Sequence, residues 1–216
     1  MSKQFAVSGQ HYLFDVQAFA HTILAAGGAE YHYALRDRST RGVLADVVDG
    51  KSELGVLMLN DATADALLAE IDAAGLEFVE LKKSSPRVAL PASHPLSNAK
   101  SLRPEELAAW PYVYFEQEDD APAYVAEEVL GDLAHAKAVA LTDRASLSEL
   151  AAAVNGYTFT SGILVGITDG GSLTTIPLET DVTLSLGYVV RKDAELTELG
   201  QRFVQNLQHN LDVYAR

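Results

Sequence analysis

The chain has 216 residues, of which 48% are hydrophobic and 21% charged, proportions that are ordinary for a globular protein able to bury a substantial core. Its net charge of −14, without clusters of lysine and arginine, argues against direct contact with nucleic acid, because phosphate binding needs clustered basic side chains. The absence of cysteine excludes disulfides, thiolate catalysis and cysteine-ligated zinc or iron–sulfur sites.

No segment has the pattern of a membrane anchor or a metal site. No apolar run reaches the length of about 18 residues that a membrane helix needs. The first residues lack the basic stretch and apolar core of a signal peptide. The six histidines are scattered and form no pair at metal-ligand spacing. We therefore expect a cytoplasmic protein with no membrane association, no metal and no cofactor.

Short β-rich runs alternate with amphipathic stretches in the first part of the chain. Helices are predicted where apolar residues recur at the helical spacing, and the apolar run at 54–59 predicts a strand buried on both faces. The predicted elements are a strand at 5–7, a helix at 12–24, a strand at 31–35, a short helix at 43–48 capped by Ser39 or Thr40, a strand at 54–59, a helix at 64–71 and a strand at 76–81.

A polar, proline-containing segment at 82–86 predicts a crossover to a second group of elements. These are a strand at 88–90, a helix beginning at Pro104, a strand at 112–115, a helix at 122–133, a strand at 138–141, a helix at 147–154, strands at 157–160, 173–176 and 184–190, and a last helix at 196–211. Such alternation is typical of an α/β protein with a mainly parallel sheet.

Five local phrases, taken in order, resemble the effector-binding domain of LysR-type transcription regulators. Each phrase is common alone, but their order and spacing cover essentially the whole chain. They are Val7-Ser8 before a long helix, DGKSELGV at 49–56, SHPL at 93–96, LAAWPYV at 107–113 and NGYT at 155–158, with IPL at 176–178 and GYVVRK at 187–192 in support.

The resemblance implies two Rossmann-like α/β lobes, similar to type 2 periplasmic binding proteins, joined by two crossovers. We place the crossovers near Ser84 and Thr183, so that lobe I comprises 1–83 and 184–216 and lobe II comprises 84–183. Full-length members carry an N-terminal winged helix-turn-helix, which is absent from this sequence. We expect an excised domain that would reach DNA only through that missing part.

The resemblance also implies that a small molecule binds in the cleft between the lobes. Strand ends and helix N-termini meet there, where free N–H groups suit an anion. The effector expected is therefore a small polar or anionic metabolite, such as a carboxylate or an amino-acid-like compound. The candidate contacts are Ser8, Gly9, Gln10 and His11 after the first strand, Ser39 and Thr40 after the second, and Glu116, Gln117 and Ser161 in lobe II.

Several of these candidates have simpler interpretations. The hydroxyl groups could only cap helices. His11 could contact a ligand or sense pH, or it could be a surface histidine. Arg38 and Arg144 could bind an acidic ligand or form ordinary ion pairs, whereas Glu116 would favour a ligand bearing an amine.

Family sensor domains form side-by-side homodimers, and higher oligomers occur. The resemblance therefore implies pairing through the helix at 12–24. We expect any of Tyr12, Val16 and Phe19 that is exposed in the monomer to mark the interface. Ligand binding in the closed cleft would then alter the relation between the two subunits.

Three other functions remain open from the sequence. The fold also suits a solute-binding protein for transport, an enzyme with a cleft carboxylate such as Glu116, or a module that binds another protein. There is no Ser–His–Asp arrangement and no phosphate loop, since the glycine-rich segment at 166–171 is predicted to be a turn before a strand. We expect no catalysis.

Overall fold

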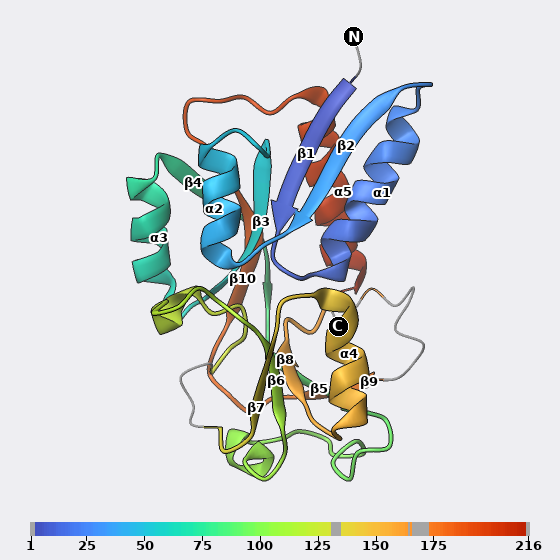
Figure 1. Ribbon diagram of the computed structural model, residues 1–216, viewed down its shortest axis with the longest axis vertical. Helices are drawn as coiled ribbons and strands as arrows, with labels where there is room; N and C mark the ends of the chain where they lie inside the picture. Colours follow the sequence, from blue (N-terminus) through green and yellow to red (C-terminus); the bar gives the residue numbers. More distant parts are fainter. Residues whose placement is uncertain (1–2, 131–134, 164, 166–172, 215–216) are drawn as a thin grey trace.

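The computed structural model describes residues 3–130, 135–163, 165 and 173–214, which form two α/β lobes stacked along the long axis of the molecule (Figure 1). The chain passes between the lobes twice, once before residue 87 and once after residue 177. Among the described residues, no helix has the length and apolar character needed to cross a membrane. That part of the chain also contains no group of three or more side chains that could ligate a metal ion.

Lobe I is built on a five-stranded sheet. Its strands are β1 (Lys3–Gly9), β2 (Tyr31–Asp37), β3 (Leu54–Asn60), β4 (Leu76–Ser84) and β10 (Leu184–Arg191), in the order β2-β1-β3-β10-β4. β1 pairs in parallel with β2 and β3, whereas β10 runs antiparallel to β3 and β4. The sheet is therefore mainly parallel, as predicted, except for β10, which returns from lobe II in the opposite direction.

Helices cover both faces of this sheet (Figure 1). They are α1 (Leu13–Ala26) and α5 (Glu198–Tyr214) on one face, and α2 (Thr40–Val48) and α3 (Ala64–Ala73) on the other. Along β3, Leu54, Val56 and Met58 pack in the core under α1 and α5, and Leu57 and Leu59 pack in the core under α2 and α3. The prediction that this apolar strand is buried on both faces is confirmed.

Lobe II has two smaller sheets. Its elements are β5 (Arg87–Pro91), β6 (Tyr112–Phe115), β7 (Ala138–Leu141), β8 (Thr158–Thr160), β9 (Leu173–Pro177), helix α4 (Arg144–Ala153) and the single 3-10 turns η1 (Pro104–Leu107) and η2 (Ala123–Val125). β5 lies antiparallel between β8 and β9, and β6 pairs in parallel with β7. The strand positions predicted in this half are confirmed to within a few residues.

The helix predicted over 122–133 is wrong within the described residues. Only η2 forms, and the chain from 126 to 130 is irregular, while 131–134 lie outside the described part. The reason lies in two acidic side chains. Glu127 accepts hydrogen bonds from His11, and Glu128 accepts one from the backbone N–H of Phe115. These contacts hold the two carboxyl groups inward from an irregular segment.

Ser161 and Gly162 follow β8, and the described residues 161–163 form no helix. Gly162 has a φ of +77°, and the Ser161 carbonyl accepts a hydrogen bond from the Ser84 hydroxyl at 2.5 Å. These features turn the chain beside the crossover instead of starting a helix. The glycine-rich segment predicted to be a turn, 166–171, lies outside the described residues.

Candidate functional site

A cavity of about 600 Å³ lies between the two lobes. Lobe I contributes the start of α1 and the ends of β2 and β3, and lobe II contributes the ends of β6 and β8, the start of α4 and the segment after η2. Its walls are mainly apolar. The apolar lining includes Leu13, Phe14, Met58, Phe115, Val129, Leu147, Phe159 and Ile163.

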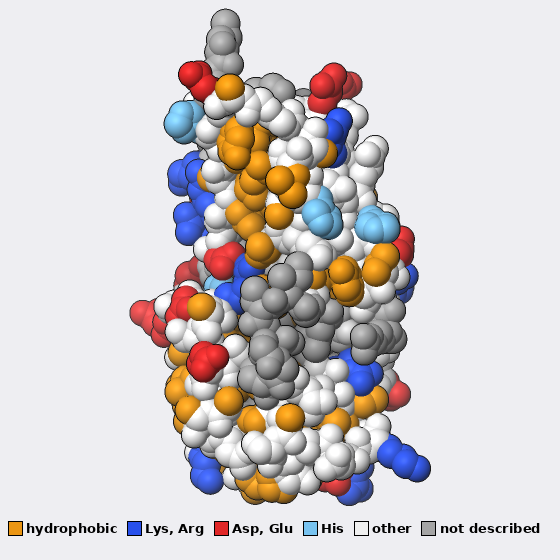
Figure 2. Space-filling model, turned by 90° about the vertical axis from the view of Figure 1, so that its right-hand side faces the viewer, with side chains coloured by type: hydrophobic (Ala, Val, Ile, Leu, Met, Phe, Trp, Pro, Cys, Tyr) orange, Lys and Arg blue, Asp and Glu red, His pale blue; other side chains and the backbone are white. Residues whose placement is uncertain are grey.

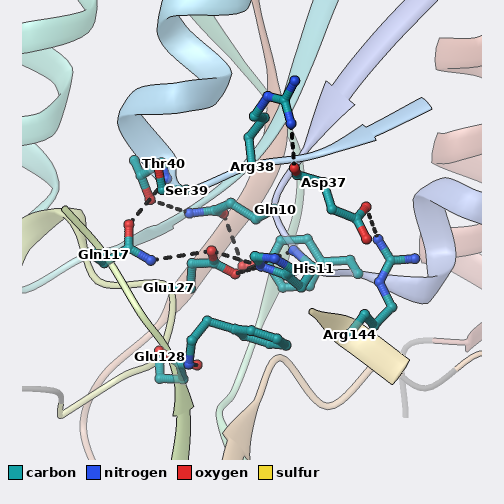
Figure 3. Close-up of polar contacts among 12 residues, drawn as sticks. Gln10, His11, Asp37, Arg38, Ser39, Thr40, Gln117, Glu127, Glu128 and Arg144 are labelled. Atoms are coloured by element: carbon teal, nitrogen blue, oxygen red, sulfur yellow. Dashed lines mark hydrogen bonds and ion pairs between the residues drawn. The ribbon is translucent and has the colours of Figure 1, made fainter. Parts of the chain in front are cut away.

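His11 and Glu127 join the lobes at one edge of this cavity (Figure 3). Each Glu127 oxygen lies 3.0 Å from His11 Nδ1, and the backbone N–H of His11 donates to Oε2 at 3.3 Å. The His11 ring stacks on Phe115 with 3.9 Å between centroids. Burial alone would lower the pKa of His11, but the hydrogen bond and charge of Glu127 outweigh it and raise that pKa above its usual value.

The N-terminus of α2 forms a second polar link between the lobes (Figure 3). The Thr40 backbone N–H donates to Gln117 Oε1 at 3.2 Å, and the Thr40 hydroxyl donates to the Val125 carbonyl at 2.6 Å. The Gln117 amide also donates to Glu127 at 3.3 Å. Ser39 caps α2 by accepting from the Gly42 N–H, which confirms its predicted capping role, and its hydroxyl also donates to Glu118.

Arg144 forms the third link, from the first turn of α4 to lobe I. Its guanidinium donates to Asp37 at the end of β2 and lies 3.9 Å from the Asp15 carboxylate. Asp15 is fully buried, and neither of its oxygens has a hydrogen-bond partner in the described part of the chain. Burial raises the pKa of Asp15 to about 7, although the charge of Arg144 opposes this rise.

Glu128 lies on the lobe II wall of the cavity with 8% of its surface exposed. Its Oε1 accepts from the Phe115 N–H at 2.8 Å. Burial, helped by the negative charge of neighbouring Glu127, raises the pKa of Glu128 to about 8. A cation that enters the cavity would stabilise the ionised form of the Glu128 carboxyl group.

Of the nine sequence-predicted contacts, His11 and Ser161 line the cavity and the other seven do not, among them Ser8, Gly9 and Glu116. The Ser8 hydroxyl is buried and bonds to Asp46 and Ser52, each at 2.8 Å, so it points beneath α2. Gly9 does not line the cavity. A Cβ at this position would overlap the Asp15 carboxyl group, so the absence of a side chain lets Asp15 pack against the backbone here. Glu116 is exposed and lies outside the lining.

Gln10 is buried beside the start of α2, whereas Ser161 lines the cavity. The Gln10 side chain is fully buried and already bonded, since its amide donates to the Thr40 hydroxyl at 2.5 Å and its oxygen accepts from Met58 N–H at 2.9 Å. Gln10 therefore holds the α2 terminus in place. Ser161 lines the cavity from lobe II, where its hydroxyl accepts from the Ile163 N–H at 3.3 Å.

A family model described as the LysR substrate binding domain matches residues 30–212. The chain belongs to this family. The LysR resemblance inferred from the five phrases is therefore confirmed, together with the two-lobe α/β fold. No curated protein sequence matches the chain.

Solved structures of LysR-family proteins share this fold. HinK, a LysR family transcriptional regulator from Pseudomonas aeruginosa, is similar with a TM-score of 0.66 and 18% identity over 97% of this chain and 71% of that one. The effector-binding domain of QuiR, solved in complex with shikimate, has a TM-score of 0.65 and 11% identity over 100% of both chains. At these identities the likeness establishes the fold.

In this LysR domain Asp15, Glu127 and Glu128 were not predicted as site residues from the sequence. One signal was available, because acidic residues stand in stretches that are otherwise apolar, such as FDV at 14–16 and VAEEVL at 125–130. The residues that they contact could not be predicted from the sequence, since His11 and Glu127, for example, are 116 positions apart. Both arginines considered for an acidic ligand form ion pairs, Arg38 with Asp46 and Arg144 with Asp37.

Proposed function

We propose that this domain senses a small-molecule effector, which binds in the cavity between the lobes, as the regulatory part of a LysR-type transcription regulator. The cavity carries the proposal, because its size of about 600 Å³ and its apolar walls with a few charged groups are typical of small-molecule sites. The shikimate in the QuiR domain, which shares the fold, supports a small ligand in this cleft. A regulator of transcription works where the DNA is, so the cytoplasm is the proposed location.

We assign some residues to ligand contact and some to lobe closure, and His11 takes part in both because it lines the cavity and bonds to Glu127. His11 and Ser161 line the cavity from opposite lobes, and we assign them to direct contact. We assign Gln10, Ser39, Thr40 and Gln117 to closing the lobes beside the ligand. An effector that touches both walls binds the closed form better than the open form and so shifts the equilibrium towards closure. This role is regulatory and not catalytic.

The effector proposed on these grounds is a small polar, amino-acid-like metabolite. The charged lining includes His11, Arg144 and several carboxyl groups, and the rest of the wall is apolar. A molecule with an apolar body and a charged end matches that division, since the polar groups orient it and the apolar walls bury the remainder.

We also propose that the domain acts as a homodimer and reaches DNA only through a separate winged helix-turn-helix. The upper face in Figure 2, seen from the α1 side, carries a group of hydrophobic side chains. Leu24 of α1 is 78% exposed, a high value for a large apolar residue. Phe19 is buried, while Tyr12 and Val16 are half-buried, so the expected interface marker shifts along α1 to Leu24.

The melting temperature of the domain against a panel of small metabolites tests the sensory role. An effector at about a hundred times its dissociation constant adds roughly 2.7 kcal/mol. For a domain of this size, that raises Tm by about 5–10 °C. We expect such a rise with one chemical class of metabolite.

A cavity-filling variant provides the control. Ala145 lines the cavity from α4, so Ala145→Trp should abolish the ligand-induced rise, whereas Ala153→Trp, on an exposed position of the same helix outside the cavity, should preserve it. A broad panel of soluble metabolites that leaves Tm unchanged would contradict the sensory role and favour a protein-binding module. A rise that persists in Ala145→Trp would place the ligand elsewhere.

A further inference from the structure

The helix N-termini at the cleft already hold oxygen acceptors from the chain itself. Before α1, the His11 N–H donates to Glu127, and at α2 the Thr40 N–H donates to Gln117. At α4, the Ser146 N–H donates to Asp143 at 2.9 Å. A carboxylate ligand would have to compete with these side-chain oxygens at each of the three positions.

The two cationic side chains in the described lining are likewise neutralised. His11 is paired with the Glu127 carboxylate, and Arg144 is paired with Asp37 and lies near Asp15. Both pairs cross between the lobes, so an anionic ligand could use either cation only by breaking a contact that closes the cleft. Displacing a buried partner leaves a charge without compensation, which is costly.

Carboxyl groups remain available on the lobe II wall. Glu128 is more than nine-tenths buried and lines the cavity, and it forms no ion pair with any described residue. Glu149 of α4 also lines the cavity and forms no ion pair within the described part of the chain. An ammonium group that enters the cavity beside Glu128 would favour the ionised form of this carboxyl group, and Glu149 adds a second carboxyl group to the same lining.

We propose that the effector is a cationic amine with an apolar body, whose ammonium group is held by Glu128 and Glu149 while the body packs against Phe115 and Phe159. This inference rests on the proposed sensory function and specifies its ligand class. It retains the amino-acid-like character expected from the sequence and replaces the carboxylate as the recognised group. In this arrangement the buried Glu128 gains a counter-charge.

Three probes with one phenyl ring and different head groups test the ligand class. They are phenethylamine, hydrocinnamate and phenylpropanol, which carry an ammonium, a carboxylate and a hydroxyl group. Titration calorimetry on the domain should give the tightest binding for phenethylamine, by about tenfold or more over hydrocinnamate, since one lost charge partner is worth roughly this factor. Tighter binding of hydrocinnamate, equal binding of phenylpropanol, or no binding of any probe would overturn the inference.

Matched variants locate the amine. Glu128→Gln keeps an oxygen for the Phe115 N–H and removes the charge, so phenethylamine binding should weaken about tenfold. Glu149→Gln, at an exposed helix position where folding is not at risk, should weaken it by about twofold or threefold. Glu116→Gln is the control, because Glu116 is exposed and outside the cavity.

Unchanged binding in Glu128→Gln and Glu149→Gln would overturn the assigned contacts. The sensory function itself fails only if no member of the full metabolite panel raises Tm. An anionic effector found in that panel would therefore refute the ligand class while leaving the sensory function intact.

Discussion

At the scale of single residues, Asp15 is a buried carboxyl group in an environment that disfavours its charge. It is fully buried under the cleft without a hydrogen-bond partner among the described residues, and its nearest opposite charge is Arg144 at 3.9 Å. Burial is the largest cause of its raised pKa of about 7. Because the folded state holds this proton more tightly than the unfolded state, stability falls as pH rises from about 4 to about 7.

Asp15→Asn should therefore stabilise the domain at neutral and higher pH. The amide has the same shape and carries no charge to desolvate, so we expect a gain of about 2 kcal/mol above pH 7. This corresponds to roughly 4–8 °C in Tm. At pH 3, below the ordinary pKa of 3.8, Asp15 is mostly protonated in both states, so the variant and the parent should melt at nearly the same temperature. A Tm at pH 8 that is equal to or below that of the parent would show that Arg144 compensates the charge fully.

At the scale of elements, helices and strands with strong local signals were predictable. The periodic apolar residues of α1 and α5, and the cap of α2 at Ser39, correspond closely to the observed helices. The segment after η2 was not predictable in this way, because Glu127 is held by His11, 116 positions away, and Glu128 by the N–H of Phe115 on β6. Tertiary contacts override local propensity when they satisfy buried polar groups.

The exposed face of α1 is the proposed dimer interface, and substitutions on it test the assembly. Leu24 is 78% exposed, so Leu24→Glu should not affect folding, but a charge there should weaken a dimer formed through α1 by about tenfold or more. Sedimentation equilibrium would measure the monomer–dimer constant. Leu68→Glu, on α3 on the opposite face of the sheet, is the matched control. If Leu68→Glu dissociates the dimer and Leu24→Glu does not, the interface lies on the α2–α3 side.

At the scale of the whole molecule, polar contacts hold the two lobes closed over the cavity. The contact between His11 and Glu127 is the one most sensitive to pH, because it is strongest when the imidazole is protonated. The pKa of His11 is raised in the folded state, so the stabilisation is complete below pH 6.5 and is lost as pH rises through that raised value. The closed form should therefore weaken from pH 6 to pH 8.

His11→Ala should remove this pH dependence and favour the open form. We expect a loss of about 1–2 kcal/mol at pH 6, the usual value of a charge-assisted hydrogen bond, and little further loss at pH 8. Small-angle scattering would report a larger radius of gyration for the variant at pH 6. His21→Ala, an exposed histidine on α1, should behave as the parent. A parent radius that stays constant from pH 6 to pH 8 would contradict this role of His11.

The sequence by itself determined the family, the two-lobe α/β class and the position of nearly every strand. Apolar periodicity and turn residues are local signals. The first indicates which face of an element is buried, and the second indicate where the element ends. Only the tertiary structure decided how the site is built. It directed Ser8 away from the cleft to Asp46, brought Glu127 to His11, and left Glu128 on the cavity wall. Ser8 and Asp46 are 38 positions apart, and His11 and Glu127 are 116 apart, so the local sequence of a side chain does not determine which distant group will bond to it.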